Sequence, residues 1–246
     1  MSNIDHGCIH HQGAPAIAIC SECNGDVCAA CHGTDLRGFC ICAVCREKFA
    51  PPQSAWEDPR TDYSPATFGR TMVEALKSPR TFFTRVRPMG PAGPAVSFGL
   101  ISMGVGLLFS NTWKLLFIEP FGQALAELAK EMSTSIEVVK ASMFLALPFQ
   151  VGLAFLLHLG ALFMALKLAG ARPTMNATAR IVGYACAGYI LMILPPIGDF
   201  MLGHFLAIIW IFNLQMGALT LLYRMGTWKT LAVVMGTLLI ILPLAF

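Results

Sequence analysis

The sequence predicts an all-α polytopic membrane domain of five transmembrane helices behind a small N-terminal metal-binding domain. Eight of the nine cysteines lie between Cys8 and Cys45, mostly in pairs separated by two residues. The rest of the chain is apolar: the 246 residues are 56% hydrophobic and only 13% charged, with a mean hydropathy of +0.64. So few charges cannot cover an ordinary soluble surface, and we expect most of the chain to lie in lipid.

The N-terminal pairs predict two zinc ions bound within residues 1–48. A gap of two residues allows one tight turn to direct both side chains at the same metal, and four pairs supply the ligands of two tetrahedral sites. His10 and His32 are minor alternatives to His11, because only His11 keeps the two-residue gap. The expected ligands are Cys8, His11, Cys20, Cys23, Cys28, Cys31, Cys42 and Cys45, with Cys40 as an alternative to Cys42.

A disulfide framework is the other interpretation of an even number of cysteines. We expect no cleavable signal peptide, because the N-terminus is polar through Gln12, and a disulfide has no use for His11. Reduced zinc thiolates are therefore favoured, and they belong in the cytosol.

Five windows lack Asp, Glu, Lys and Arg, and each supplies all or most of a helix of about 20 residues, the length that crosses a hydrocarbon core. The Pro195-Pro196-Ile197-Gly198 turn separates the third and fourth windows, since this sequence is a poor helix interior and a good hairpin. The expected spans lie near residues 94–116, 142–167, 178–197, 200–223 and 228–246, within a membrane domain of residues 89–246.

Basic residues alternate with these spans and predict the orientation. By the positive-inside rule, the segments before the first span, between the second and third, and between the fourth and fifth lie in the cytoplasm. This places the N-terminus inside and the C-terminus on the opposite side. Residues 117–141 are acidic and keep apolar residues at helical spacing, so we expect a helix on the outer face. The later cytoplasmic charges are Lys167, Arg172, Arg180, Arg224 and Lys229.

Two different segments connect the metal-binding domain to the first span. Residues 49–64 contain three prolines and are expected to form an extended linker. Residues 65–88 are basic and amphipathic, with Pro79 interrupting the helical spacing. Such a segment usually lies among lipid headgroups, where anionic lipid attracts its charges; a solvated linker is the alternative. The charges are Arg70, Lys77, Arg80, Arg85 and Arg87.

Several function classes are not supported. The chain has no H-E-x-x-H, G-x-S-x-G or G-x4-G-K-[ST] motif, and four protein ligands per zinc leave no position for a substrate, so we expect no enzyme. Arg37 is the only basic residue within residues 1–45, against four acidic ones, so the cysteine region lacks the positive footprint of nucleic-acid binding. A protein partner is expected instead.

Two family resemblances follow from local motifs. Cys8-x2-His11, residues 16–23 (AIAICSEC), residues 27–31 (VCAAC) and residues 38–40 (GFC) resemble a B-box-type zinc finger at the N-termini of bacterial membrane proteins. Residues 77–83 (KSPRTFF), 194–198 (LPPIG) and 208–210 (IIW), with Gly217, resemble the Yip family of multispanning membrane proteins, named for Ypt/Rab-interacting members.

These resemblances imply a cross-braced finger in a bacterial inner membrane protein. Cys8, His11, Cys28 and Cys31 would hold one zinc, and Cys20, Cys23 and Cys45, with Cys42 or Cys40, the other. Because Ala43 stands three residues after Cys40, only Cys42 keeps the two-residue gap to Cys45. Eukaryotic Yip members bind small GTPases and trafficking factors, which implies a protein partner here.

A membrane adaptor or scaffold is therefore the expected function, with a cytoplasmic or membrane protein as partner and a homo-oligomer as a further possibility. The alternative is a small transporter or lipid-handling protein that uses polar groups at membrane depth, namely His158, Asp199 and His204. Ordinary packing also accounts for these groups, and the chain contains no visible inverted repeat.

Overall fold

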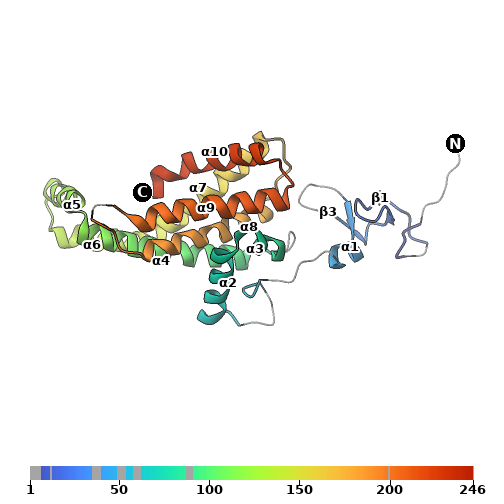
Figure 1. Cartoon of the computed structure of the whole chain (residues 1–246), viewed down its shortest axis with the longest axis horizontal. Helices are drawn as coiled ribbons and strands as arrows, with labels where there is room; N and C mark the ends of the chain where they lie inside the picture. Colours follow the sequence, from blue (N-terminus) through green and yellow to red (C-terminus); the bar gives the residue numbers. More distant parts are fainter. Residues whose placement is uncertain are drawn as a thin grey trace.

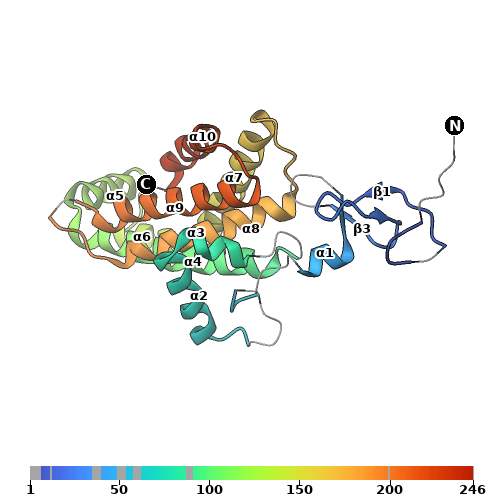
Figure 2. The ribbon, with the colours of Figure 1, turned by 45° about the vertical axis from the view of Figure 1, so that its right-hand side comes forward.

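The computed structural model describes residues 7–11, 13–34, 40–48, 54–57, 62–86, 91–198 and 200–245. Figures 1 and 2 show a small finger of short strands and one helix, followed by an elongated bundle of helices. The finger lies beyond one end of the bundle in both views. The hairpin of α5 (Glu119–Glu131) and α6 (Ile136–Leu145) lies at the other end.

Two antiparallel strand pairs form the finger. β1 (Ala18–Ile19) pairs with β2 (Asp26–Val27), and β3 (His32–Thr34) pairs with β4 (Cys40–Cys42), which leads into α1 (Ala43–Lys48). Strands this short bury little apolar surface. Of the eight residues in the finger's buried cluster, six are cysteines, so the cysteines themselves form the interior.

Among the described residues, three helices are long and apolar enough to cross a membrane: α4 (Gly93–Phe117), α7 (Leu147–Leu168) and α9 (Leu202–Leu222). They match the expected spans 94–116, 142–167 and 200–223. The expectation of five continuous spanning helices is thus corrected to three. The second span starts later than expected, because Pro148 favours the first turn of a new helix over the interior of an existing one.

The other two expected spans take different forms. Residues 178–197 fall on α8 (Met175–Ala185) and the 3₁₀ helix η1 (Cys186–Ile193), which ends before the Pro195-Pro196 turn. The last expected span is α10 (Thr227–Ala245), whose described apolar stretch is the shorter Thr227–Ile240. Hydropathy records how apolar a segment is but not its hydrogen-bond spacing, so the change to 3₁₀ geometry was not predictable from it.

The helices α8 and η1 form the centre of the bundle, since every residue from Ala177 to Tyr189 is buried. They pack between α4 and α9. A Cβ on Gly99 of α4 would approach the backbone of Gly183 in α8 to 2.7 Å, which no real Cβ does. A Cβ on Gly188 of η1 would lie 3.0 Å from the carbonyl oxygen of Ala207 in α9. Small residues therefore allow these helix backbones to touch.

Residues 65–86 are helical on both sides of the expected interruption, as α2 (Pro65–Lys77) and α3 (Pro79–Arg85). Phe82 and Phe83 are buried, and α3 packs against α9. The Trp210 indole N–H of α9 also donates to the Leu76 carbonyl oxygen over 2.8 Å. This segment is part of the bundle rather than a loosely attached surface helix. Its basic side chains Arg70, Lys77, Arg80 and Arg85 are exposed, and Arg87 lies outside the described residues.

The acidic segment 117–141 is helical, as expected, but it forms the hairpin of α5 and α6 instead of one helix. The two helices are separated by a turn in which Ser133 has φ 51°. A left-handed residue at this point ends α5 and reverses the chain.

We predict that Gly183→Ala destabilises the bundle by about 1–3 kcal/mol, the range for overpacking a close contact. The added methyl would meet the backbone of Ala95. Thermal unfolding in detergent measures the loss. Gly160→Ala in α7 is the matched control, because a Cβ there has no neighbour within 4 Å. Equal stability of the two variants would contradict the central role of this contact.

Candidate metal centres and the buried anchor of the finger

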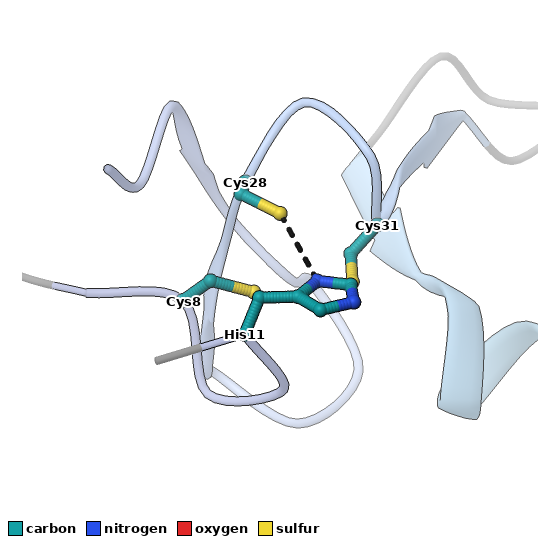
Figure 3. Close-up of side chains that lie close together, drawn as sticks. All are labelled: Cys8, His11, Cys28 and Cys31. Atoms are coloured by element: carbon teal, nitrogen blue, oxygen red, sulfur yellow. Dashed lines mark hydrogen bonds between the residues drawn. The ribbon is translucent and has the colours of Figure 1, made fainter. Parts of the chain in front are cut away.

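The first candidate centre consists of Cys8, His11, Cys28 and Cys31, whose ligand atoms all lie within 4.8 Å of one another. His11 Nδ1 lies 3.4 Å from Cys28 Sγ and 3.1 Å from Cys31 Sγ. Figure 3 shows the imidazole and the sulfurs converging from separate loops of the finger. Three sulfurs and one nitrogen at this spacing can hold a tetrahedral metal ion.

The second candidate centre consists of Cys20, Cys23, Cys42 and Cys45, again with all ligand atoms within 4.8 Å of one another. Cys23 Sγ and Cys42 Sγ are 3.9 Å apart. The backbone N–H of Cys42 donates to Cys20 Sγ over 3.3 Å, and the N–H of Cys45 donates to Cys42 Sγ over 3.3 Å. Such N–H donors stabilise sulfur in its thiolate form.

The alternative ligands lie outside both groups. Cys40 packs against the finger's buried cluster, but its sulfur is not part of the second group, which takes Cys42. Within the part of the finger that the structure describes, His10 and His32 also join neither group. The geometry therefore groups the side chains as the cross-brace resemblance implied, with the first and third pairs together and the second and fourth together.

Hydrogen bonds favour the thiolate form of at least one cysteine in each centre, whereas burial raises the pKa of Cys31 in the first centre and of Cys45 in the second. The backbone N–H of Cys31, followed by the His11 side chain, lowers the pKa of the Cys28 thiol. Burial raises the pKa of Cys20, but hydrogen bonds led by the backbone N–H of Cys42 outweigh it and bring that pKa down to about 6. Deprotonated sulfur is what a soft divalent metal binds, so the donor sets fit such an ion.

A buried anchor links the finger's chain to the helical bundle. Residues 54–57 belong to the segment expected to be an extended linker, yet Ser54 and Trp56 are buried in the bundle. The Trp56 indole N–H donates to the Pro94 carbonyl oxygen over 2.7 Å, and the Trp56 backbone N–H donates to Thr71 Oγ1 over 3.1 Å. The Trp56 ring contacts the rings of Phe68 and Phe98 edge-on.

An ion pair completes the anchor. Glu57 binds the guanidinium of Arg180 on α8, and both side chains are almost fully buried, at 5% and 4% exposed. Ser54 Oγ lies 3.2 Å from the hydroxyl of Tyr184, one turn further along α8. Glu57 and Arg180 are 123 residues apart in the chain, so spacing gave no sign of the pair. Within residues 54–57, the local signal of burial was Trp56, a large apolar residue in a Pro-rich stretch.

The polar residues at membrane depth form two separate pairs. His158 of α7 is fully buried and hydrogen-bonds Gln215 of α9. His204 of α9 hydrogen-bonds Ser110 of α4 over 2.8 Å. His204 and Gln215 are eleven residues apart on α9, or about 16 Å along the helix axis. Asp199 lies outside the described residues.

Comparison with known proteins assigns the membrane part. Residues 73–246, which include α3, the central α8 and η1 and all three long apolar helices, match the family model of the Yip1 domain. The finger and residues 54–57 precede the matched region. No curated protein and no solved structure matches the chain. Since the match covers most of the sequence, the chain is a multi-pass membrane protein that belongs to the Yip1 domain family.

Proposed function

We propose that the chain is a non-enzymatic membrane adaptor or scaffold whose cytoplasmic zinc finger recruits a protein partner to the membrane. The observation that carries this proposal is the pair of complete four-ligand groups in a finger tied to an apolar bundle. A finger with all four coordination positions filled by protein offers its surface to a partner and no open metal position to a substrate.

Zinc is the ion that these donor sets favour. One site offers three thiolates and an imidazole and the other offers four thiolates, which are the ligand sets of structural zinc. Once bound, the ion would supply the folding free energy that the finger's short strands do not. The B-box class of the finger is part of the proposal, supported by the pairing of first with third and second with fourth ligand pairs.

The three long apolar helices leave α8 with η1, and α10, as shorter or broken apolar segments, and crossing of the membrane by these two segments is part of the same proposal. α8 has 11 residues, which rise about 1.5 Å each, and η1 has 8 residues, which rise about 2.0 Å each. End to end, the two helices span about 32 Å. The 19 residues of α10 span about 28 Å. Both lengths are close to the roughly 30 Å of a hydrocarbon core.

The proposed orientation has the N-terminus in the cytoplasm and the C-terminus across a bacterial inner membrane. It is supported by the basic turns between α7 and α8 and between α9 and α10, which lie at the same end of the bundle as the finger, and by the acidic α5–α6 hairpin at the other end (Figure 1). The exposed basic residues of α2 and α3 suit contact with anionic lipid.

The alternative, a small transporter or lipid-handling protein, has less support. Its polar groups include two pairs about 16 Å apart, and helix packing explains hydrogen-bonded pairs of this kind. A pathway would require the pairs to connect.

We predict that the purified protein contains two zinc ions. Cys23→Ser should lose the ion of the second centre, whereas Cys40→Ser, the matched control, should retain both, because Cys40 lies outside the ligand group. Elemental analysis of the purified variants measures the zinc content. One zinc per wild-type chain, or loss of zinc in Cys40→Ser, would contradict the assignment.

We predict that partner recruitment depends on the finger and not on the intramembrane pairs. Affinity purification of the detergent-solubilised protein should recover a specific partner that is lost with Cys23→Ser and retained with His158→Ala and His204→Ala. Quantitative mass spectrometry of the eluates compares the variants. If the histidine variants lose function while Cys23→Ser keeps it, the transporter becomes the better assignment.

We predict that Glu57→Gln destabilises the bundle by about 3–5 kcal/mol, because it leaves the Arg180 guanidinium buried without its counter-ion. Arg85→Gln is the control: Arg85 lies 3.8 Å from Glu74 in a pair that is 52% and 31% exposed, and such pairs contribute about 0–1 kcal/mol. Thermal unfolding in detergent measures both losses.

A double substitution separates the charge from the packing. Glu57→Leu combined with Arg180→Met should recover much of the stability that Glu57→Gln loses, since a buried apolar pair avoids the desolvation of two charges. Equal stability of Glu57→Gln and Arg85→Gln would show that the buried Glu57–Arg180 pair does not contribute to the anchor.

A further inference from the structure

We infer that the cleft between two adjoining turns of the bundle binds the phosphate-bearing headgroup of an anionic membrane lipid. One turn joins α7 to α8 and the other joins α9 to α10. Together they enclose a cavity of about 470 Å³ whose walls include Gly170, Arg172, Tyr223, Arg224 and Lys229. This volume suits a headgroup rather than a whole lipid, so the acyl chains would lie outside it.

The charge of the cleft selects an anion. Arg172 comes from the first turn and Arg224 and Lys229 from the second, and the wall contains no acidic residue. Within the described ranges, none of these three side chains pairs with a carboxylate. Two guanidinium groups offer planar pairs of N–H donors that match phosphate oxygens, and the ammonium adds a third positive charge.

The backbone of the cleft supports the same ligand. Lys229 lies in the first turn of α10, whose first helical hydrogen bond runs from the N–H of Thr230 to the carbonyl oxygen of Gly226. The preceding N–H groups at this helix start have no carbonyl within the helix, so they give the cleft a positive partial charge.

The backbone conformation of Arg224 is a further indication that the cleft binds a ligand. It follows the C-cap of α9 with φ 48°, in a position and conformation that glycine normally occupies. A large side chain there costs backbone free energy, which the fold tolerates at the point where the guanidinium borders the cleft.

The residues beside the cleft favour a lipid over a soluble phosphate compound. Leu168 and Trp228 flank the two turns and are 84% and 83% exposed. Exposure of these two side chains to water would be unfavourable. In a membrane, tryptophan is enriched at the level of the lipid headgroups and leucine suits the acyl region. A headgroup in the cleft would therefore place its chains against apolar side chains. The inference rests on the proposed membrane crossings and not on the finger's partner.

The test uses full-length, delipidated protein in neutral detergent, with phosphatidylglycerol or phosphatidylcholine added and bound lipid counted by native mass spectrometry. We expect selective retention of phosphatidylglycerol. Arg172→Gln and Arg224→Asn should each weaken it about fivefold, the value of one cation near an anionic group. Asparagine tolerates the left-handed conformation, and Arg224→Gly provides a second variant without backbone strain.

Two further pairs of substitutions and one competing anion test whether the lipid binds in the cleft. Lys130→Gln with Lys140→Gln removes two charges from the opposite hairpin and should leave retention unchanged. Unchanged retention in the cleft variants, with loss in Arg80→Gln and Arg85→Gln, would place the lipid on α2 and α3 and overturn the inference. Inorganic phosphate that occupies the cleft in the same Arg-dependent manner, without selective phosphatidylglycerol binding, would identify a soluble anion and overturn it as well.

Discussion

The close approach of α8 and η1 to α4 and α9 determines the geometry of everything around them. Apolar helices in lipid gain nothing from the hydrophobic effect when they associate, so contact must come from tight packing of their backbones. Gly99, Gly183 and Gly188 provide that contact, because each stands where a side chain would collide with a neighbouring helix. This packing buries the first turns of α8, and it thereby fixes Arg180 and Tyr184 where the residues of the anchor reach them.

The finger follows a different principle. Its strands contain two or three residues each, and its buried cluster includes only Val27 and Ile41 besides cysteines. A domain of this size has too little apolar surface to offset the entropy of ordering its chain, and the proposed metal ligation would replace the missing core. The candidate ligands could be predicted from the sequence, because tetrahedral coordination requires particular residues at particular spacing. The grouping into two sets and the selection of Cys42 over Cys40 then follow from the fold.

The membrane part was predictable in its helices and unpredictable in its long-range contacts. Charge-free windows identified α4 and α9 nearly to the residue, since the length of a span is set by the bilayer. The same windows could not reveal the 3₁₀ geometry of η1, which packs between α4 and α9. Nor could they reveal the anchor, because the proline content of residues 49–64 indicated a linker. Glu57 is buried against Arg180, and the two residues are neighbours only in the folded chain.

The anchor also constrains where a partner bound to the finger can stand. Lys48 ends α1 and Ser54 is buried in the bundle, so six residue steps separate them. Even fully extended, such a stretch covers only about 20 Å. A finger on a free linker of residues 49–64 would sample a far larger volume, and its partner would have a lower effective concentration at the membrane. The Glu57–Arg180 pair therefore shortens the tether between finger and bundle, and under the proposed function this short tether would keep a recruited protein close to the membrane surface.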